Sequence, residues 1–219
     1  MIKLLRLSAT IMLMLPIMAC NGIFADIYDS PEDNNGNGES EFGFTVPCTE
    51  STPGTIYIDA TDFLHWIYID FSEQSVETLG IFDQAPENWD IALHHYDVKT
   101  NGAMAAPTTA QTVASAIKGD GFSVGEYEAD TWTNDKIAVD LADMMSGNIV
   151  YCESWYNRVI SSWMSVDIQI MPPVYVHSGK VFSVRLADGG KVFLRLANYV
   201  NQAGSKGYLT IEYQYNAGV

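Results

Sequence analysis

Methionine is the residue type whose placement in this sequence most invites a chemical explanation. Beyond residue 19 the chain holds five methionines, and four of them lie in or beside segments interrupted by glycine or proline. These are Met104 in NGAMAAP, Met144 and Met145 in DMMSG, and Met171 in QIMPP. A thioether is a soft, uncharged ligand that suits haem iron, although exposed methionines also mark adaptable binding surfaces. The fifth, Met164, lies in an apolar run and is expected to fill the core.

Other reactive residue types give weaker patterns. His94 and His95 are adjacent, so on a regular strand they would point to opposite faces and could not share one metal. We therefore expect packed or hydrogen-bonded histidines. No GxSxG, HExxH, P-loop or GxGxxG motif lies in a suitable context, and no carboxylate pair stands out. The sequence predicts a protein that is not an enzyme.

The N-terminus has the layout of a lipoprotein signal. Lys3 and Arg6 precede an apolar run over residues 7–18, and Ala19 then precedes Cys20. The run is shorter than the roughly 20 residues that a membrane-spanning helix requires. We expect residues 1–19 to be removed and Cys20 to be lipidated, which predicts a protein anchored to the outer membrane and exposed at the cell surface.

Composition divides the remaining chain. Residues 20–47 are rich in Asn, Gly, Asp, Glu and Ser, which predicts an acidic flexible tether. Residues 48–219 suit a single domain with one core. The net charge is −16, and it becomes −18 without Lys3 and Arg6. This charge makes nucleic acid an unsuitable partner. Cys48 and Cys152 could form a disulfide, but their spacing leaves that open.

The elements that must position the methionines are mainly strands. Alternating or β-branched runs predict strands over residues 55–59, 65–71, 89–98, 137–141, 162–170, 180–186, 191–199 and 208–215. Residues 109–118 predict one short helix. Gly189 and Gly190 lie between two of the strands and predict a tight hairpin turn. These elements favour an all-β antiparallel sandwich or open barrel with few short helices.

Several segments, in order, resemble the HmuY-like haem-binding lipoproteins. They are TIYIDATDFLHWIYIDFS at residues 55–72, WDIALHHYDVKTNG at 89–102, VFSVRLADGGKV at 181–192 and ANYVNQAGSKGYLTIEYQY at 197–215. The resemblance implies an all-β fold shaped like a right hand, in which two finger hairpins or loops grip the porphyrin. Each finger supplies one axial ligand to the haem iron, and the ligands are histidines in some members and methionines in others.

The resemblance also implies where the ligands lie. One falls between Trp163 and Tyr175, where the family's histidine position aligns to Ile168, so Met171 is the preferred substitute. The other falls after residues 137–141, where Met144 and Met145 stand. We prefer Met145, because it lies nearer the turn that follows.

Aromatic side chains near these positions could contact the porphyrin or pack in the core: Tyr151, Trp155, Tyr156 and Trp163.

The expected function is that of a haemophore for iron acquisition. Its expected partners are haem, host haem proteins and a TonB-dependent haem receptor of the outer membrane, together with the lipid bilayer. The alternative is a non-enzymatic surface lipoprotein that binds glycans or host proteins through aromatic-rich loops, since fold alone does not decide function.

Overall fold

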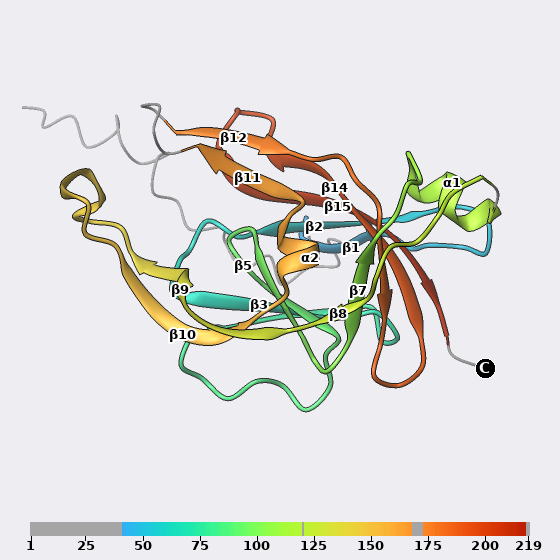
Figure 1. The fold of residues 1–219 in the computed structure, drawn as a ribbon, viewed down its shortest axis with the longest axis horizontal. Helices are drawn as coiled ribbons and strands as arrows, with labels where there is room; N and C mark the ends of the chain where they lie inside the picture. Colours follow the sequence, from blue (N-terminus) through green and yellow to red (C-terminus); the bar gives the residue numbers. More distant parts are fainter. Residues whose placement is uncertain (1–40, 120, 168–172, 218–219) are drawn as a thin grey trace, which may run out of the picture. The chain divides into compact units, whose positions relative to one another are not determined.

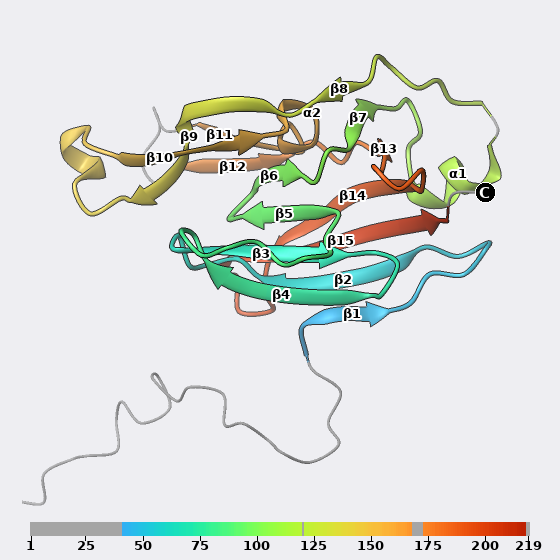
Figure 2. The ribbon, with the colours of Figure 1, turned by 90° about the horizontal axis from the view of Figure 1, so that it is seen from below.

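Two antiparallel sheets form the body of the structure, a computed structural model that describes residues 41–119, 121–167 and 173–217 (Figures 1 and 2). The larger sheet contains, in spatial order, β1 (Gly43–Val46), β2 (Gly54–Asp59), β15 (Lys206–Asn216), β14 (Lys191–Val200), β13 (Phe182–Arg185), β7 (Met104–Pro107) and β8 (Glu128–Ala129). The smaller sheet contains β4 (Ser75–Gly80), β3 (His65–Asp70), β5 (Ile91–His94) and β6 (Asp97–Thr100). The all-β prediction is confirmed.

Two separate hairpins project from this body on the side away from the first helix (Figure 1). One pairs β9 (Thr131–Asp140) with β10 (Val150–Tyr156), and a 3-10 turn, η2 (Met144–Ser146), lies between them. The other pairs β11 (Met164–Asp167) with β12 (Val174–His177). The short helices are α1 (Val113–Lys118) and α2 (Arg158–Ser161).

The main core lies between the two sheets. Side chains alternate along β2, so that Ile56 and Ile58 are buried against Ile67 and Ile69 of the smaller sheet and their neighbours. Trp163 joins this core from the segment between α2 and β11, and its indole Nε1 donates to the carbonyl of Tyr96 at 2.7 Å. A buried tryptophan normally needs such a partner for its N–H. The contact fixes the root of the β11–β12 hairpin beside the β5–β6 turn.

A half-buried carboxylate holds the two ends of the β9–β10 hairpin together. Asp130 precedes β9 and accepts hydrogen bonds from the backbone N–H of Thr100 at 2.6 Å and from its hydroxyl at 2.9 Å. It also accepts from Nδ2 of Asn157, which follows β10, at 2.9 Å. Asn157 in turn caps α2 by accepting from the N–H of Ile160. One carboxylate thus joins β6 to both roots of the hairpin.

Several details follow the sequence predictions. Residues 180–199 form the β13–β14 hairpin, and Gly189 adopts the left-handed φ of 92° that its turn requires. The predicted helix over residues 109–118 is α1, which begins later because Thr112 caps it.

Two details differ from the sequence predictions, and a third answers the open question of the disulfide. The single strand predicted over residues 89–98 is wrong, because the chain reverses at His95 and forms the β5–β6 hairpin. Gly43–Val46 lies within the predicted tether, yet it forms β1 and pairs with β2. Cys48 and Cys152 are both free thiols. In the ranges given above, no helix has the length and apolar character needed to cross a membrane.

Candidate functional site

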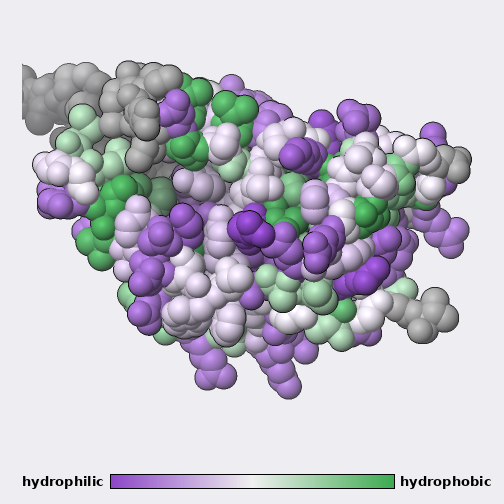
Figure 3. Space-filling view, viewed as in Figure 1, coloured by the Kyte–Doolittle hydropathy of each residue, from purple (hydrophilic) through white to green (hydrophobic). Residues whose placement is uncertain are grey.

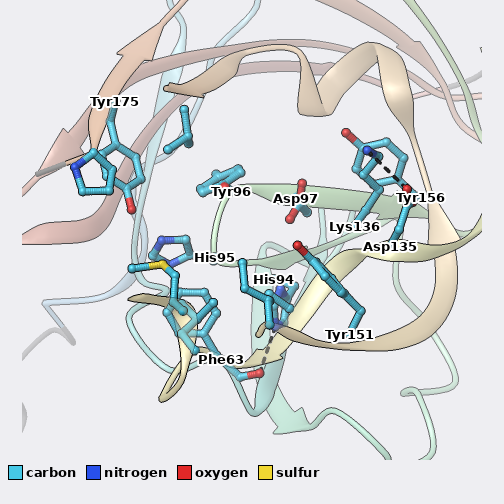
Figure 4. Close-up of a pocket in the computed structure, with 16 residues that line it drawn as sticks. Phe63, His94, His95, Tyr96, Asp97, Asp135, Lys136, Tyr151, Tyr156 and Tyr175 are labelled. Atoms are coloured by element: carbon cyan, nitrogen blue, oxygen red, sulfur yellow. Dashed lines mark hydrogen bonds and ion pairs between the residues drawn. The ribbon is translucent and has the colours of Figure 1, made fainter. Parts of the chain in front are cut away.

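A cavity of about 300 Å³ lies between the two projecting hairpins and the β5–β6 turn (Figure 4). Its described walls come from β9, η2 and β10 on one side, from β11, Pro173 and β12 on another, and from residues 94–97 at the base. Five aromatic rings line it: Phe63, Tyr96, Tyr151, Tyr156 and Tyr175. Aromatic walls with few polar groups are typical of sites for small, largely apolar ligands.

One aromatic wall is tied to the larger sheet. Tyr175 of β12 stacks on Tyr199 of β14, with ring centroids 5.5 Å apart and ring planes 18° apart. Tyr96 meets both rings edge-on. The ammonium of Lys206 lies 4.2 Å from the centroid of Tyr175 and donates to the carbonyl of Pro173 at 3.2 Å. These contacts hold β12 against β14 and β15, and so they fix one side of the cavity.

The base of the cavity is a strained turn. His94 and Asp97 pair across the hairpin, which leaves His95 and Tyr96 as a two-residue turn, and His95 has a φ of 57°. A left-handed residue other than glycine costs roughly 1–3 kcal/mol and persists only where surrounding contacts hold it. Here the imidazole Nδ1 donates to the carbonyl of Ala60 at 2.8 Å, and Nε2 accepts from the hydroxyl of Tyr199.

Burial favours the neutral form of both histidines. Burial lowers the pKa of His95 to about 4 and lowers the pKa of His94. His94 is 1% exposed and donates from Nε2 to the carbonyl of Phe63 at 2.9 Å. Its Nδ1 has no hydrogen-bond partner among the described residues. The prediction of packed and hydrogen-bonded histidines agrees with these contacts, but both histidines line one cavity, because a turn replaces the expected strand.

An unusual carboxyl group also faces the cavity. Burial raises the pKa of Asp97 to about 7, and the nearby Lys136 partly opposes this shift. Lys136 is the only lysine or arginine among the described lining residues. The cavity therefore combines aromatic walls with one ammonium, which lies 3.8 Å from the lining carboxylate of Asp135, and with an acid whose pKa is near neutral.

The structure separates the methionines singled out in the sequence. Met144 is half-buried and lines the cavity, whereas Met145 is 78% exposed and does not. The preference for Met145 therefore lacks structural support. It relied on nearness to the following turn, but both methionines lie in η2, a 3-10 turn in which successive side chains diverge by about 120°. Met171 lies outside the described residues. Met164 is buried in the core as predicted.

The aromatic candidates also separate. Tyr151 and Tyr156 line the cavity, Trp155 does not line it and is exposed, and Trp163 is part of the core. Tyr96 and Phe63 were not among the residues predicted from sequence, and Tyr175 had no predicted role beyond marking the end of a segment. Tyr96 carries a local signal, because it follows the paired histidines in an aromatic-rich run. Phe63 lies in a loop that shows no pattern.

Exposed apolar side chains concentrate on the same hairpins. The described residues expose thirteen large hydrophobic side chains, and seven of them belong to the β9–β10 and β11–β12 regions: Trp132, Met145, Val150, Tyr151, Trp155, Val174 and Val176. In Figure 3, green patches lie on the left, where the hairpins project. Such concentration is typical of a surface that meets a ligand or partner.

The donor set fits a haem better than a bare metal ion. No group of three or more His, Cys, Asp or Glu side chains able to hold a metal occurs in the part of the chain that the structure describes. A haem carries its own four nitrogen ligands and needs from the protein only an apolar slot and axial donors. The described lining offers an aromatic slot and one thioether, that of Met144.

Comparisons with solved structures identify several relatives. A candidate HmuY-like haem-binding protein from Bacteroides vulgatus is 45% identical, with a TM-score of 0.73, and the match covers 79% of this chain and 97% of that one. A candidate lipoprotein from Bacteroides fragilis is 35% identical, with a TM-score of 0.75 and coverages of 81% and 97%. An apo HmuY analogue from Tannerella forsythia is 25% identical, with a TM-score of 0.64 and coverages of 75% and 95%.

A comparison with curated proteins finds no match. The family model described as HmuY protein matches residues 62–213, which is more than half of the sequence and spans both hairpins and the cavity. The chain therefore belongs to the HmuY family.

Proposed function

We propose that this protein captures haem in the cavity between the β9–β10 and β11–β12 hairpins. The observation that carries the proposal is the joint placement of five aromatic rings and the Met144 thioether around one cavity, in a chain of the HmuY family. Two of the similar solved structures support it, because one is described as a candidate HmuY-like haem-binding protein and another as an HmuY analogue. The apolar walls would hold the porphyrin, and Lys136 would pair with a propionate.

Met144 and Met171 are the proposed axial ligands. Met144 lines the cavity, and Met171 is proposed from the sequence alone. A thioether has no proton to gain near neutral pH, so mild acid should weaken haem binding less than it would with histidine ligands. Soft ligands favour the lower oxidation state, so ferrous haem should bind more tightly than ferric haem.

The proposed cellular role follows from the N-terminal sequence. Lipidation of Cys20 would anchor the protein in the outer membrane with the domain at the cell surface. There it would take haem from host haem proteins and pass it to a TonB-dependent receptor. Net negative charge suits a protein that must remain soluble outside the cell.

An absorbance titration with haemin, repeated after dithionite reduction, tests the proposal. We expect a saturable Soret shift and sharp α and β bands in the reduced sample. Met144→Ala and Met171→Ala should each lose the sharp ferrous bands and bind haem at least about tenfold more weakly, as expected when one of two axial bonds is removed.

Met145→Ala is the matched control, because Met145 is adjacent in sequence but exposed. It should behave as the parent does. Loss of binding in Met145→Ala, with Met144→Ala unchanged, would reverse the assignment within η2. A parent spectrum that stays that of free haem in both redox states would contradict haem capture itself.

A further inference from the structure

A second cavity, of about 490 Å³, lies apart from the haem cavity and shares no lining residue with it. It is formed by the loop that precedes β5, the end of β6 and its following turn, the segment before β9, and β10. Trp89, Lys99, Asn101, Asp130 and Trp155 supply its large side chains, and alanine and glycine residues supply much of the rest. The proposed haem function makes no use of these residues.

Lys99 is a cation whose hydrogen-bonding capacity is only partly used. Its ammonium lies 3.9 Å from the ring centroid of Trp66 and 5.0 Å from that of Tyr68. Its one hydrogen bond within the described residues goes to the hydroxyl of Tyr68, at 3.2 Å. An ammonium has three protons to donate, so two remain for a ligand. Burial lowers the pKa of Lys99 to about 8.

Hydrogen-bond acceptors line the same cavity. Asp130 receives three hydrogen bonds, from Thr100 and Asn157, whereas a carboxylate can accept about four. Asn101 donates from Nδ2 to the carbonyl of Trp89 at 2.9 Å. Its side-chain oxygen faces no donor among the hydrogen bonds of the described residues. Donors and acceptors therefore stand side by side, as vicinal hydroxyl groups require, because each hydroxyl both donates and accepts.

Two indole rings provide apolar surface next to these polar groups. Trp89 and Trp155 line the cavity, and Trp155 is 53% exposed. Trp132, which is 56% exposed, packs edge-on against Trp155 with ring centroids 5.4 Å apart. Exposed neighbouring tryptophans are costly to leave in water unless they meet a partner. The aromatic surface thus continues from the cavity onto the outside of the β9–β10 hairpin.

We propose that this second cavity binds a neutral pyranose oligosaccharide. The apolar face of one sugar ring would lie on Trp155 or Trp89, and its hydroxyls would accept from Lys99 and donate to Asp130 and Asn101. The next rings would follow the surface toward Trp132. Asp130 and the net charge of −16 would repel a polyanion, and the ammonium of Lys99 would repel a cationic group placed beside it. A neutral sugar therefore fits this cavity better than a charged ligand.

Isothermal titration calorimetry of the purified protein with maltohexaose, cellohexaose, mannohexaose and chitohexaose tests the proposal. Hexagalacturonate serves as the anionic comparator. We expect saturable heat from at least one neutral hexamer and a weaker response to hexagalacturonate. Trp155→Ala should weaken binding about tenfold or more, since an exposed tryptophan anchor commonly carries that share of an interface. Lys99→Met, which keeps an apolar stem, should weaken it as well.

Tyr208→Ala is the matched control, because it removes a ring from the separate Phe42, Tyr57 and Tyr208 stack on the larger sheet. It should bind the sugar as the parent does. Haemin titration of every variant checks folding and keeps the two sites distinguishable, since Trp155→Ala should retain the Soret shift. Three results would each overturn the proposal. They are no heat with any of the four neutral hexamers, binding of hexagalacturonate alone, and unchanged sugar binding in both Trp155→Ala and Lys99→Met.

Discussion

Protonation of His95 and protonation of Asp97 should change the free energy of unfolding in opposite directions. The pKa of His95 falls from 6.5 to about 4 on folding, so His95 contributes stability above pH 6.5 that is lost as the pH falls toward 4. The pKa of Asp97 rises from 3.8 to about 7, so ionisation of Asp97 destabilises the fold increasingly as the pH rises from 4 to 7. The two effects therefore have opposite signs in the same pH window.

Each effect is of similar size between pH 7 and pH 5. One pKa unit corresponds to 1.36 kcal/mol, so acidification over this range should cost about 2 kcal/mol through His95. Over the same range, protonation of Asp97 should raise the free energy of unfolding by about 2 kcal/mol. In the parent, the contributions of His95 and Asp97 to the pH dependence of the unfolding free energy should nearly cancel. Replacing either residue should make the contribution of the other measurable.

Urea unfolding of the haem-free protein, followed by tryptophan fluorescence at pH 7 and pH 5, measures the effect. His95→Asn keeps a residue that tolerates positive φ but does not titrate, and it should gain about 2 kcal/mol on acidification relative to the parent. Asp97→Asn should lose about 2 kcal/mol relative to the parent. The comparison uses pH dependence, so any change in baseline stability is not counted. If both variants followed the parent's pH dependence, the buried, neutral state of His95 and the raised pKa of Asp97 would both be refuted.

Two further substitutions test contacts that build the site, and a third tests a helix cap away from it. Asn157→Ala should lower the free energy of unfolding by about 2 kcal/mol or more, because it removes the cap of α2 and a bond to Asp130, and urea unfolding measures this; a loss below about 0.5 kcal/mol would show that neither contact matters. Trp163→Phe should cost about 1–3 kcal/mol by leaving the carbonyl of Tyr96 unpaired, whereas unchanged stability would mean that water replaces the indole. Thr112→Ala should cost about 1 kcal/mol in thermal unfolding and leave haemin titration unaltered, since α1 lies at the far end from the hairpins; an altered Soret shift would contradict that separation.

Regular strands with one buried face were predictable. Residues 208–215 alternate between buried and partly exposed side chains, and β15 follows that pattern. In β14 the alternation breaks at Phe193, which is also buried because it packs against Val113 and Ala116 of α1. Strand β9 was predicted only over its last residues. Its first six residues carry mainly exposed side chains on both faces, so the alternation that identifies a half-buried strand is missing there.

The β5–β6 turn was not predictable from local sequence. HHYD contains neither glycine nor asparagine, which normally supply the positive φ of a tight hairpin turn, and it reads as part of one strand. The conformation of His95 depends on Ala60 and Tyr199, which lie 35 and 104 residues away in the chain. The same long-range pairing places Tyr96 beside Tyr175. Local sequence patterns do not predict contacts between residues so far apart in the chain.

The Asp130 carboxylate has a consequence for how this protein could diversify. It fastens both roots of the β9–β10 hairpin to β6, and Ile137 and Cys152 pack on the smaller sheet. Residues 141–150, around η2, belong to none of the described core clusters. Substitutions around η2 should therefore change ligand preference with little loss of folding stability. New ligand chemistry could arise there by point mutation, while the sandwich below stays the same.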